Sequence, residues 1–157
     1  MLSTTYEVPN DARVRIYRAV GIAVGESTIL CPHHRFGMAN RPGAITIGSH
    51  CYVNQYCWFD AGDATITLGD HVVIAAGVSF QAITHGVDSK ARRAVGEESY
   101  PITVEDGSWL GIGTIILPGV TIASGCITGA GAVVTSSTEP NGVYAGVPAV
   151  RIRDLSD

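Results

Sequence analysis

Apolar residues recur along this chain at a fixed step of six residues. The longest run extends from residue 104 to residue 134, where every group opens on an apolar side chain except the one that begins with Thr128. A mostly small residue lies two positions before each next opening. The openings are Val104, Leu110, Ile116, Ile122, Thr128 and Val134. This period is typical of a β-helix, in which each group of six forms one short strand and its corner.

The same step continues upstream, where two groups of three openings are separated by a three-residue insertion. Plain alternation of apolar and polar residues would predict strands here, but it would not produce a fixed step of six. Because three groups complete one turn of a triangular coil, the openings are predicted to stack in three ladders. These ladders are Ile47, Leu68, Val104 and Ile122; Val53, Ile74, Leu110 and Thr128; and Phe59, Phe80, Ile116 and Val134.

Three segments depart from the repeat. Residues 11–20 are expected to form a short helix, with Asp11 near its start and Gly21 after its end. The stretch before Val104 contains a long polar excursion, and polar loops that leave a rigid scaffold often carry function. The expected organisation is a single domain over residues 1–157, with an N-terminal segment over 1–23, the β-helix over 24–134 with a loop over 86–101, and a C-terminal cap over 135–157.

The composition and charge of the chain argue against several classes of function. The net charge is −4 and Lys90 is the only lysine, which argues against the basic surface that a nucleic-acid-binding protein needs. No apolar run is long enough to span a membrane. The first ten residues lack the charged and apolar regions of a signal peptide, so a cytoplasmic protein is expected.

The four cysteines fit a reduced interior better than disulfides or a metal site. Cys51, Cys57 and Cys126 occupy the small position that is predicted to point into the coil, where a free cysteine behaves as a small apolar residue. The position of Cys31 is left open by the repeat.

His85 differs from the other histidines because it closes the last group before the excursion. The ordinary pKa of a histidine side chain lies near neutrality, which suits a general base acting on an alcohol. An isolated histidine at a corner is more often a solvated side chain, but its place beside the excursion favours catalysis. The other four histidines, His33, His34, His50 and His71, are interpreted as surface residues.

Larger polar side chains interrupt a position that elsewhere holds mostly glycine or alanine, the second of each group. Such departures from a local rule often mark functional sites, although a polar side chain at a corner also bonds to backbone. We favour function for Asn54 and a corner hydrogen bond for Gln81, and Asp60 remains open. Exposed aromatic residues at the outward sixth position, Tyr52, Trp58 and Trp109, are expected in interfaces or beside a substrate.

These features together resemble the hexapeptide-repeat acyltransferases, and within them the galactoside and maltose acetyltransferase branch, which includes streptogramin and polysaccharide O-acetyltransferases. The resemblance extends over roughly residues 45–153. The motifs that carry it are Asn54 with Cys57 and Asp60, Ile66–Asp70, Ala82–His85, Pro101–Ile102, Trp109–Gly111, Ile116–Ile122, Gly129–Gly131 and Ala145–Ala149.

The resemblance implies a left-handed parallel β-helix that forms homotrimers. It also implies acetyl-CoA as the acyl donor in a groove between two subunits, no metal, and direct acetyl transfer to a hydroxyl of a sugar or other small alcohol. His85 matches the catalytic base of the family. The other implied site residues are Asn54, Asp60 and Trp58 for the acceptor, and Trp109, Gly111, Gly113, Gly129, Ala130, Thr135 and Arg153 for acetyl-CoA.

The sequence departs from the family at two positions, and two other functions are possible for a β-helix. Many relatives carry a lysine where this chain has Ser136, and an arginine where it has Val150, so the contacts to the nucleotide end of CoA are open. A β-helix can also serve as a non-catalytic assembly subunit. A zinc enzyme of the γ-type carbonic anhydrase kind would need three clustered histidines, whereas the repeat offers only scattered ones.

Overall fold

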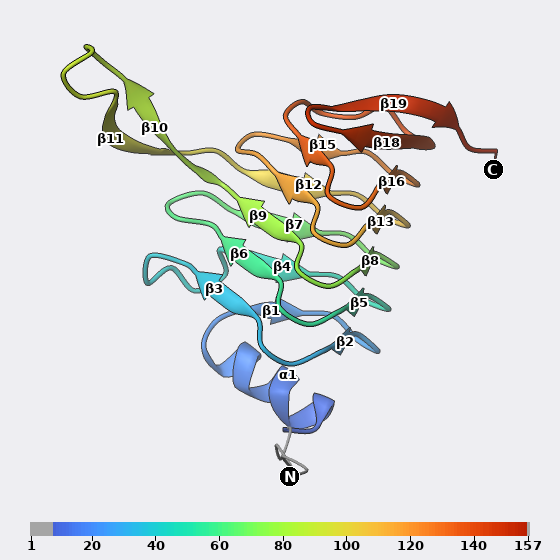
Figure 1. Cartoon of the computed structure of the whole chain (residues 1–157). Coiled ribbons are helices and arrows are strands. Elements are labelled where there is room, and N and C mark those ends of the chain that lie inside the picture. Colours follow the sequence, from blue (N-terminus) through green and yellow to red (C-terminus); the bar gives the residue numbers. More distant parts are fainter. Residues whose placement is uncertain (1–7, 157) are drawn as a thin grey trace, which may run out of the picture.

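The computed structural model describes residues 8–156 as one short helix followed by a coil of short parallel strands (Figure 1). Residues 1–7 of the expected N-terminal segment and residue 157 of the expected cap lie outside the described residues. Helix α1 (Asn10–Ala19) lies at one end of the coil, as residues 11–20 were predicted to form a helix. The parallel β-helix predicted from the six-residue step is confirmed.

The strands of the coil form three sheets, one for each side, and neighbouring strands pair in parallel except in the C-terminal hairpin of face B. Face A consists of β1 (Ala23–Val24), β4 (Ile45–Ile47), β7 (Ile66–Leu68), β12 (Ile102–Val104) and β15 (Thr121–Ile122). Face B consists of β2 (Ile29–Leu30), β5 (Tyr52–Val53), β8 (Val73–Ile74), β13 (Trp109–Leu110), β16 (Ile127–Thr128), β18 (Gly142–Gly146) and β19 (Ala149–Asp154). Face C consists of β3 (Arg35–Gly37), β6 (Trp58–Asp60), β9 (Ser79–Gln81), β14 (Ile115–Ile116) and β17 (Val133–Val134).

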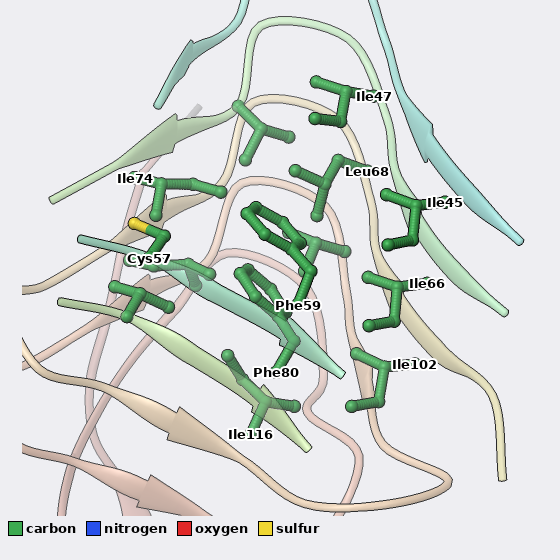
Figure 2. Close-up of a cluster of buried hydrophobic side chains, with 14 of the residues drawn as sticks. Ile45, Ile47, Cys57, Phe59, Ile66, Leu68, Ile74, Phe80, Ile102 and Ile116 are labelled. Carbon is green, nitrogen blue, oxygen red and sulfur yellow. The ribbon is translucent and has the colours of Figure 1, made fainter. Parts of the chain in front are cut away.

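All three predicted ladders are confirmed by the strand register. Ile74, for example, pairs with Val53 on one side and with Leu110 on the other. The ragged first turn continues the ladders, because Phe36 lies beside Phe59. Figure 2 shows the ladder side chains converging inside the coil, where the rings of Phe59 and Phe80 stack with centroids 4.6 Å apart.

The small inward positions are also filled as expected. Cys51, Cys57 and Cys126 are buried and unpaired, and Cys31 is half-buried. The one polar ladder residue, Thr128, receives a hydrogen bond from the backbone N–H of Gly111 and shares another with Thr114. A buried hydroxyl is tolerated at this position because its hydrogen bonds are made inside the coil.

One histidine is not where the sequence analysis placed it. His33, His50 and His71 are exposed, as predicted, but the surface assignment of His34 was wrong. Both ring nitrogens of His34 are buried and have no hydrogen-bond partner among the described residues. Its ring packs against three aromatic rings, those of Tyr17, Phe36 and Phe59. His34 fills the small inward position of the first turn, where α1 closes the open end of the coil.

The two ends of the coil are closed differently. At the N-terminal end, the Arg13 side chain of α1 donates a hydrogen bond to the Leu30 carbonyl, and the Asn10 side chain accepts one from the Leu30 N–H at 2.9 Å. At the C-terminal end, β18 and β19 form an antiparallel hairpin that continues face B beside β16. The expected cap is therefore a strand addition, and a cis peptide bond before Pro148 lies in its turn.

The polar excursion is a β-hairpin rather than an irregular loop. Strands β10 (Ile83–Val87) and β11 (Ala94–Ser99) pair in antiparallel fashion and project away from the coil (Figure 1). The hairpin leaves the coil after β9, so it begins a few residues before the predicted boundary at residue 86. Within residues 8–156, no helix is long and apolar enough to cross a membrane.

Candidate active site

His85 lies in the middle of β10, at the point where the hairpin changes register. It pairs with Glu97 across the hairpin, whereas the next residue, Gly86, pairs with Val95. Gly96 is therefore an additional residue in β11 without a partner in β10, which defines a β-bulge. Its φ angle is +59°, in the left-handed region that glycine adopts without steric cost.

The bulge brings a backbone acceptor to the imidazole of His85. The carbonyl oxygen of Gly96 lies 2.7 Å from Nδ1 of His85. A carbonyl oxygen only accepts hydrogen bonds, so Nδ1 carries the proton in this contact. In the neutral ring Nε2 then has a free lone pair, and the ring is exposed.

Two carboxylates lie near the base of the same hairpin. Asp60 ends β6, and burial, followed by the negative charge of Glu97, raises the pKa of its carboxyl above the usual range. Glu97 is the residue that pairs with His85 across the hairpin. Asp60, the undecided residue of the sequence analysis, is thus placed on the same side of the coil as His85.

Five other predicted site residues lie at the opposite edge of face C. We define the B/C corner as the segments that join a face B strand to the following face C strand. Asn54 lies on this corner between β5 and β6, and the predicted acetyl-CoA residues Gly111, Gly113, Gly129 and Ala130 lie on it in two later turns. The hairpin leaves from the far end of face C. Because a strand of three residues spans about 10 Å, a single chain separates the two groups by the width of a face.

Asn54 makes a local corner contact in the isolated chain. Its side-chain oxygen accepts a hydrogen bond of 2.8 Å from the backbone N–H of Gln55. Gln81, for which a structural role was favoured, donates to the Ser79 hydroxyl at 2.6 Å. The carboxamide of Asn54 is only half-buried, so this contact leaves part of it facing solvent.

The predicted aromatic residues point outward. Trp109 and Tyr52 lie on the outer side of face B, with 50% and 39% of their surface exposed, and Trp58 lies on the outer side of face C, 41% exposed. Trp109 lies two residues before Gly111, the first glycine of the B/C corner in its turn. An exposed indole beside glycine backbone offers an apolar wall to an extended ligand, whereas the N–H groups of Gly111, Gly113 and Gly129 already donate to backbone carbonyls of neighbouring strands and turns.

The remaining two residues lie near the C-terminal end of the coil. Thr135 is exposed and follows β17, and Arg153 is exposed on β19. Arg151 is instead bound within the cap, because its side chain forms a 2.7 Å ion pair with Asp154 and donates to the Glu139 carbonyl. Of the two arginines, Arg153 is the one that was predicted to contact acetyl-CoA, and no ion pair within the described residues holds its side chain.

The residue that the sequence analysis missed is Gly96. Nothing in a polar stretch distinguishes a glycine that forms a bulge from one that forms a turn, because the bulge depends on the pairing of two strands. The only indication in the sequence is a single glycine between Val95 and Glu97 in a segment otherwise rich in charged residues.

Comparison with known proteins agrees with the fold and with the repeat. Residues 101–136 match the model of the bacterial transferase hexapeptide family, six repeats. The galactoside O-acetyltransferase of Escherichia coli strain K12 is 34% identical over 147 residues, which cover 94% of this chain and 70% of that protein. A putative acetyltransferase of Schizosaccharomyces pombe is 40% identical over 113 residues, which cover 72% of this chain and 54% of that protein. The matched part of the chain thus spans only 54% and 70% of the length of these two relatives.

A solved structure extends the similarity to nearly the whole chain. The hexapeptide-repeat acetyltransferase of Vibrio cholerae, crystallised in complex with acetyl coenzyme A, superposes with a TM-score of 0.86. It is 29% identical and the match covers 97% of this chain and 81% of that one. Among the described residues, no group of three or more histidine, cysteine, aspartate or glutamate side chains is arranged to hold a metal ion.

Proposed function

Because the chain belongs to the hexapeptide-repeat acetyltransferases, we propose that it transfers the acetyl group of acetyl-CoA to a hydroxyl of a sugar or another small alcohol. One observation supports the assignment of the base more than any other: Nδ1 of His85 faces a carbonyl oxygen that can only accept a hydrogen bond. The Nε2 atom of the neutral ring is therefore the atom that accepts a proton from the acceptor.

The proposed reaction is a direct transfer. Nε2 of His85 accepts the proton of the acceptor hydroxyl as its oxygen attacks the carbonyl carbon of the thioester. The C–S bond of the resulting tetrahedral intermediate then breaks, the acetyl ester is released, and the thiolate of CoA takes up the proton from the imidazolium. General-base catalysis of this kind typically contributes about 10²–10⁴-fold to the rate.

We propose that two copies of the chain build each site. Asn54 and the glycines of the B/C corner lie at one edge of face C, and His85 lies beyond the other. A cyclic homotrimer, which the family resemblance implies, would bring the B/C corner of one subunit to the hairpin of the next. The outer side of face B supports this assembly, because its register row is apolar from Ile29 to Val143.

The remaining residues take roles around this groove. Trp109 would pack beside the pantetheine arm, and the glycines at 111, 113 and 129 and Ala130 would let that arm approach the backbone. The N–H groups of Gly111, Gly113 and Gly129 already donate to backbone carbonyls, so the oxyanion of the intermediate needs other donors. Asn54, Asp60 and Trp58 would hold the acceptor, and Thr135 and Arg153 would contact CoA nearer the C-terminal end.

Replacing the proposed base tests the function directly. In His85→Ala we expect kcat to fall by about 10²–10⁴-fold, while the fold and the affinity for CoA remain, because only the proton acceptor is removed. The measurement is CoA thiol release from acetyl-CoA over a panel of sugars and alcohols, followed by steady-state kinetics with the best acceptor.

His71→Ala is the matched control, because His71 is exposed on a coil corner away from the hairpin. Its kcat should equal that of the wild type. Equal values of kcat for His85→Ala and the wild type would remove His85 from the chemistry. The absence of any acetyl-CoA-dependent turnover by the wild type would instead favour a non-catalytic assembly subunit.

A further inference from the structure

We infer that Gly96 is a positioning residue for catalysis: its left-handed backbone turns a carbonyl towards Nδ1 of His85 and so selects the tautomer in which Nε2 is the base. This inference rests on the proposed function of His85. It concerns a residue on the opposite strand of the hairpin, which contacts neither the donor nor the acceptor in the proposed reaction.

The hairpin is regular on both sides of Gly96 and irregular only there. From Ile83 to His85 the residues of β10 pair in sequence with Ser99 to Glu97, and the pairing resumes between Gly86 and Val95. The extra residue falls opposite the histidine. Bulges re-aim side chains and backbone groups at a chosen point of a hairpin, and they occur often beside active sites.

The requirement for glycine at this position comes from the backbone angle and not from lack of space. The φ angle of Gly96 is +59°, and a Cβ atom added to it would meet no atom within 4 Å. A Cβ atom would therefore fit without collision, but a β-branched residue would disfavour the left-handed conformation. If the residue leaves that conformation, its carbonyl turns and the hydrogen bond to Nδ1 is lost.

The tautomer matters because only one ring nitrogen can face the acceptor. A neutral imidazole has one protonated and one unprotonated nitrogen, and the hydrogen bond made by one decides the state of the other. Without a carbonyl at Nδ1, part of the enzyme would carry the proton on Nε2. That fraction could not accept the proton of the acceptor hydroxyl.

The test compares valine substitutions at two glycines of similar conformation. Gly107 also has a left-handed φ angle, +69°, and open space around its Cα, but it lies on a coil corner between β12 and β13. We expect Gly96→Val to lower kcat by about 10- to 100-fold with little change in the KM for acetyl-CoA, because a wrong tautomer removes the base and leaves the donor site intact. Gly107→Val should keep the kcat of the wild type in whatever fraction folds.

A rescue variant and a spectroscopic measurement separate tautomer control from a general effect on the hairpin. Asparagine tolerates the left-handed conformation better than other non-glycine residues, so Gly96→Asn should recover most of the lost kcat. The ¹⁵N chemical shifts of His85 should report protonation at Nδ1 in the wild type and in Gly96→Asn. In Gly96→Val they should move towards the Nε2-protonated form.

The outcomes distinguish this inference from the proposed function. If His85→Ala loses activity but Gly96→Val keeps both kcat and the wild-type ¹⁵N shifts, Gly96 is not a positioning residue and His85 remains the base. If Gly96→Asn is as impaired as Gly96→Val, the side chain and not the backbone angle is responsible, and the inference fails. An unimpaired His85→Ala would overturn the proposed function first.

Discussion

Faces A and B of the coil share one interior but differ on their outer sides. The outward residue of four of the five face A strands is a threonine: Thr46, Thr67, Thr103 and Thr121. The corresponding row on face B is apolar and includes Tyr52, Val73, Trp109 and Ile127. Both rows consist largely of β-branched or aromatic residues, which suit a strand equally well. Strand formation therefore does not explain the difference.

The difference separates the requirements of folding from those of assembly. Inward residues on both faces are fully buried, so the coil has a complete core without help from the outer rows. Threonine on an outer row presents hydroxyl groups to water. A continuous apolar row is costly in water and marks a surface that is covered by another protein. Face B is the side on which we place the neighbouring subunit.

The largest effect is expected where a charge is placed on the inner side of a strand. Ile74 is fully buried between Val53 and Leu110, so in Ile74→Asp an unpaired carboxylate would lie inside the coil. We expect the subunit to unfold, with a loss that exceeds about 4–5 kcal/mol. Circular dichroism of the purified chain checks this. A folded, soluble Ile74→Asp protein would contradict the inner register.

Moving the same charge by one residue should change assembly and leave the fold intact. Val73 precedes Ile74 in β8 and lies on the outer side of face B, 41% exposed. In Val73→Asp each subunit interface would contain a charge on an apolar surface, so we expect a folded monomer at micromolar concentration. Because the proposed groove needs two copies, acetyl transfer should be lost together with the trimer.

Thr46→Asp is the matched control on face A. The substituted side chain points outward from the centre of β4, where it would remain in water. Light scattering after size-exclusion chromatography should return a trimer for the wild type and for Thr46→Asp, and acetyl transfer should be unchanged. A trimeric Val73→Asp together with a dissociated Thr46→Asp would move the interface from face B to face A.

The coil itself was predictable because its geometry is periodic. A step of six fixes which residue of each strand points inward, so residues far apart in sequence, such as Phe59 and Phe80, could be paired from position alone. The outer rows follow from the same register. The expected loop over residues 86–101 was the exception, because pairing in a hairpin that leaves the coil is not governed by the repeat.

The candidate site was predictable only in part. His85 was found because it lies where the repeat stops, whereas the acetyl-CoA residues of the B/C corner were implied by the resemblance to the family. The hydrogen bond to His85 was not accessible, since it depends on the bulge at Gly96. Nor could the sequence show that His85 and Asn54 lie at opposite edges of one face.

His34 shows why the repeat is a poor guide to side-chain direction at the end of the coil. In later turns its inward position holds the smaller residues Cys57, Val78 and Thr114. The histidine was assigned to the surface because it lies in the irregular first turn and lacks the setting of His85. The first turn has no coil below it. Its inward space is instead enclosed by α1, and a ring fills the gap beside Tyr17.

This buried ring gives the smallest of the expected effects and the only one that depends on pH. Burial, then the positive charge of Arg13 and then His33, lowers the pKa of His34 from 6.5 to about 4. Between these two values the unfolded chain binds a proton at His34 and the folded chain does not, so the free energy of unfolding falls as the pH decreases from about 6.5 towards about 4.

The loss of unfolding free energy attributable to His34 should reach about 2–3 kcal/mol by pH ~4.5 and should be fully absent above neutrality.

His34→Phe keeps an aromatic ring in the gap but cannot be protonated, so its unfolding free energy should decline less over the same pH range. His50→Gln is the control, because His50 is exposed on a coil corner and is not among the groups that shift the pKa of His34. Urea unfolding at pH 7 and pH ~4.5, at one protein concentration, measures the difference for all three proteins. Carboxylates that titrate in this range affect the three proteins alike, so only the difference between them reports on His34. If the wild type and His34→Phe lose equal stability, His34 is protonated without cost in the folded chain and the ring must lie on the outer side of the first turn.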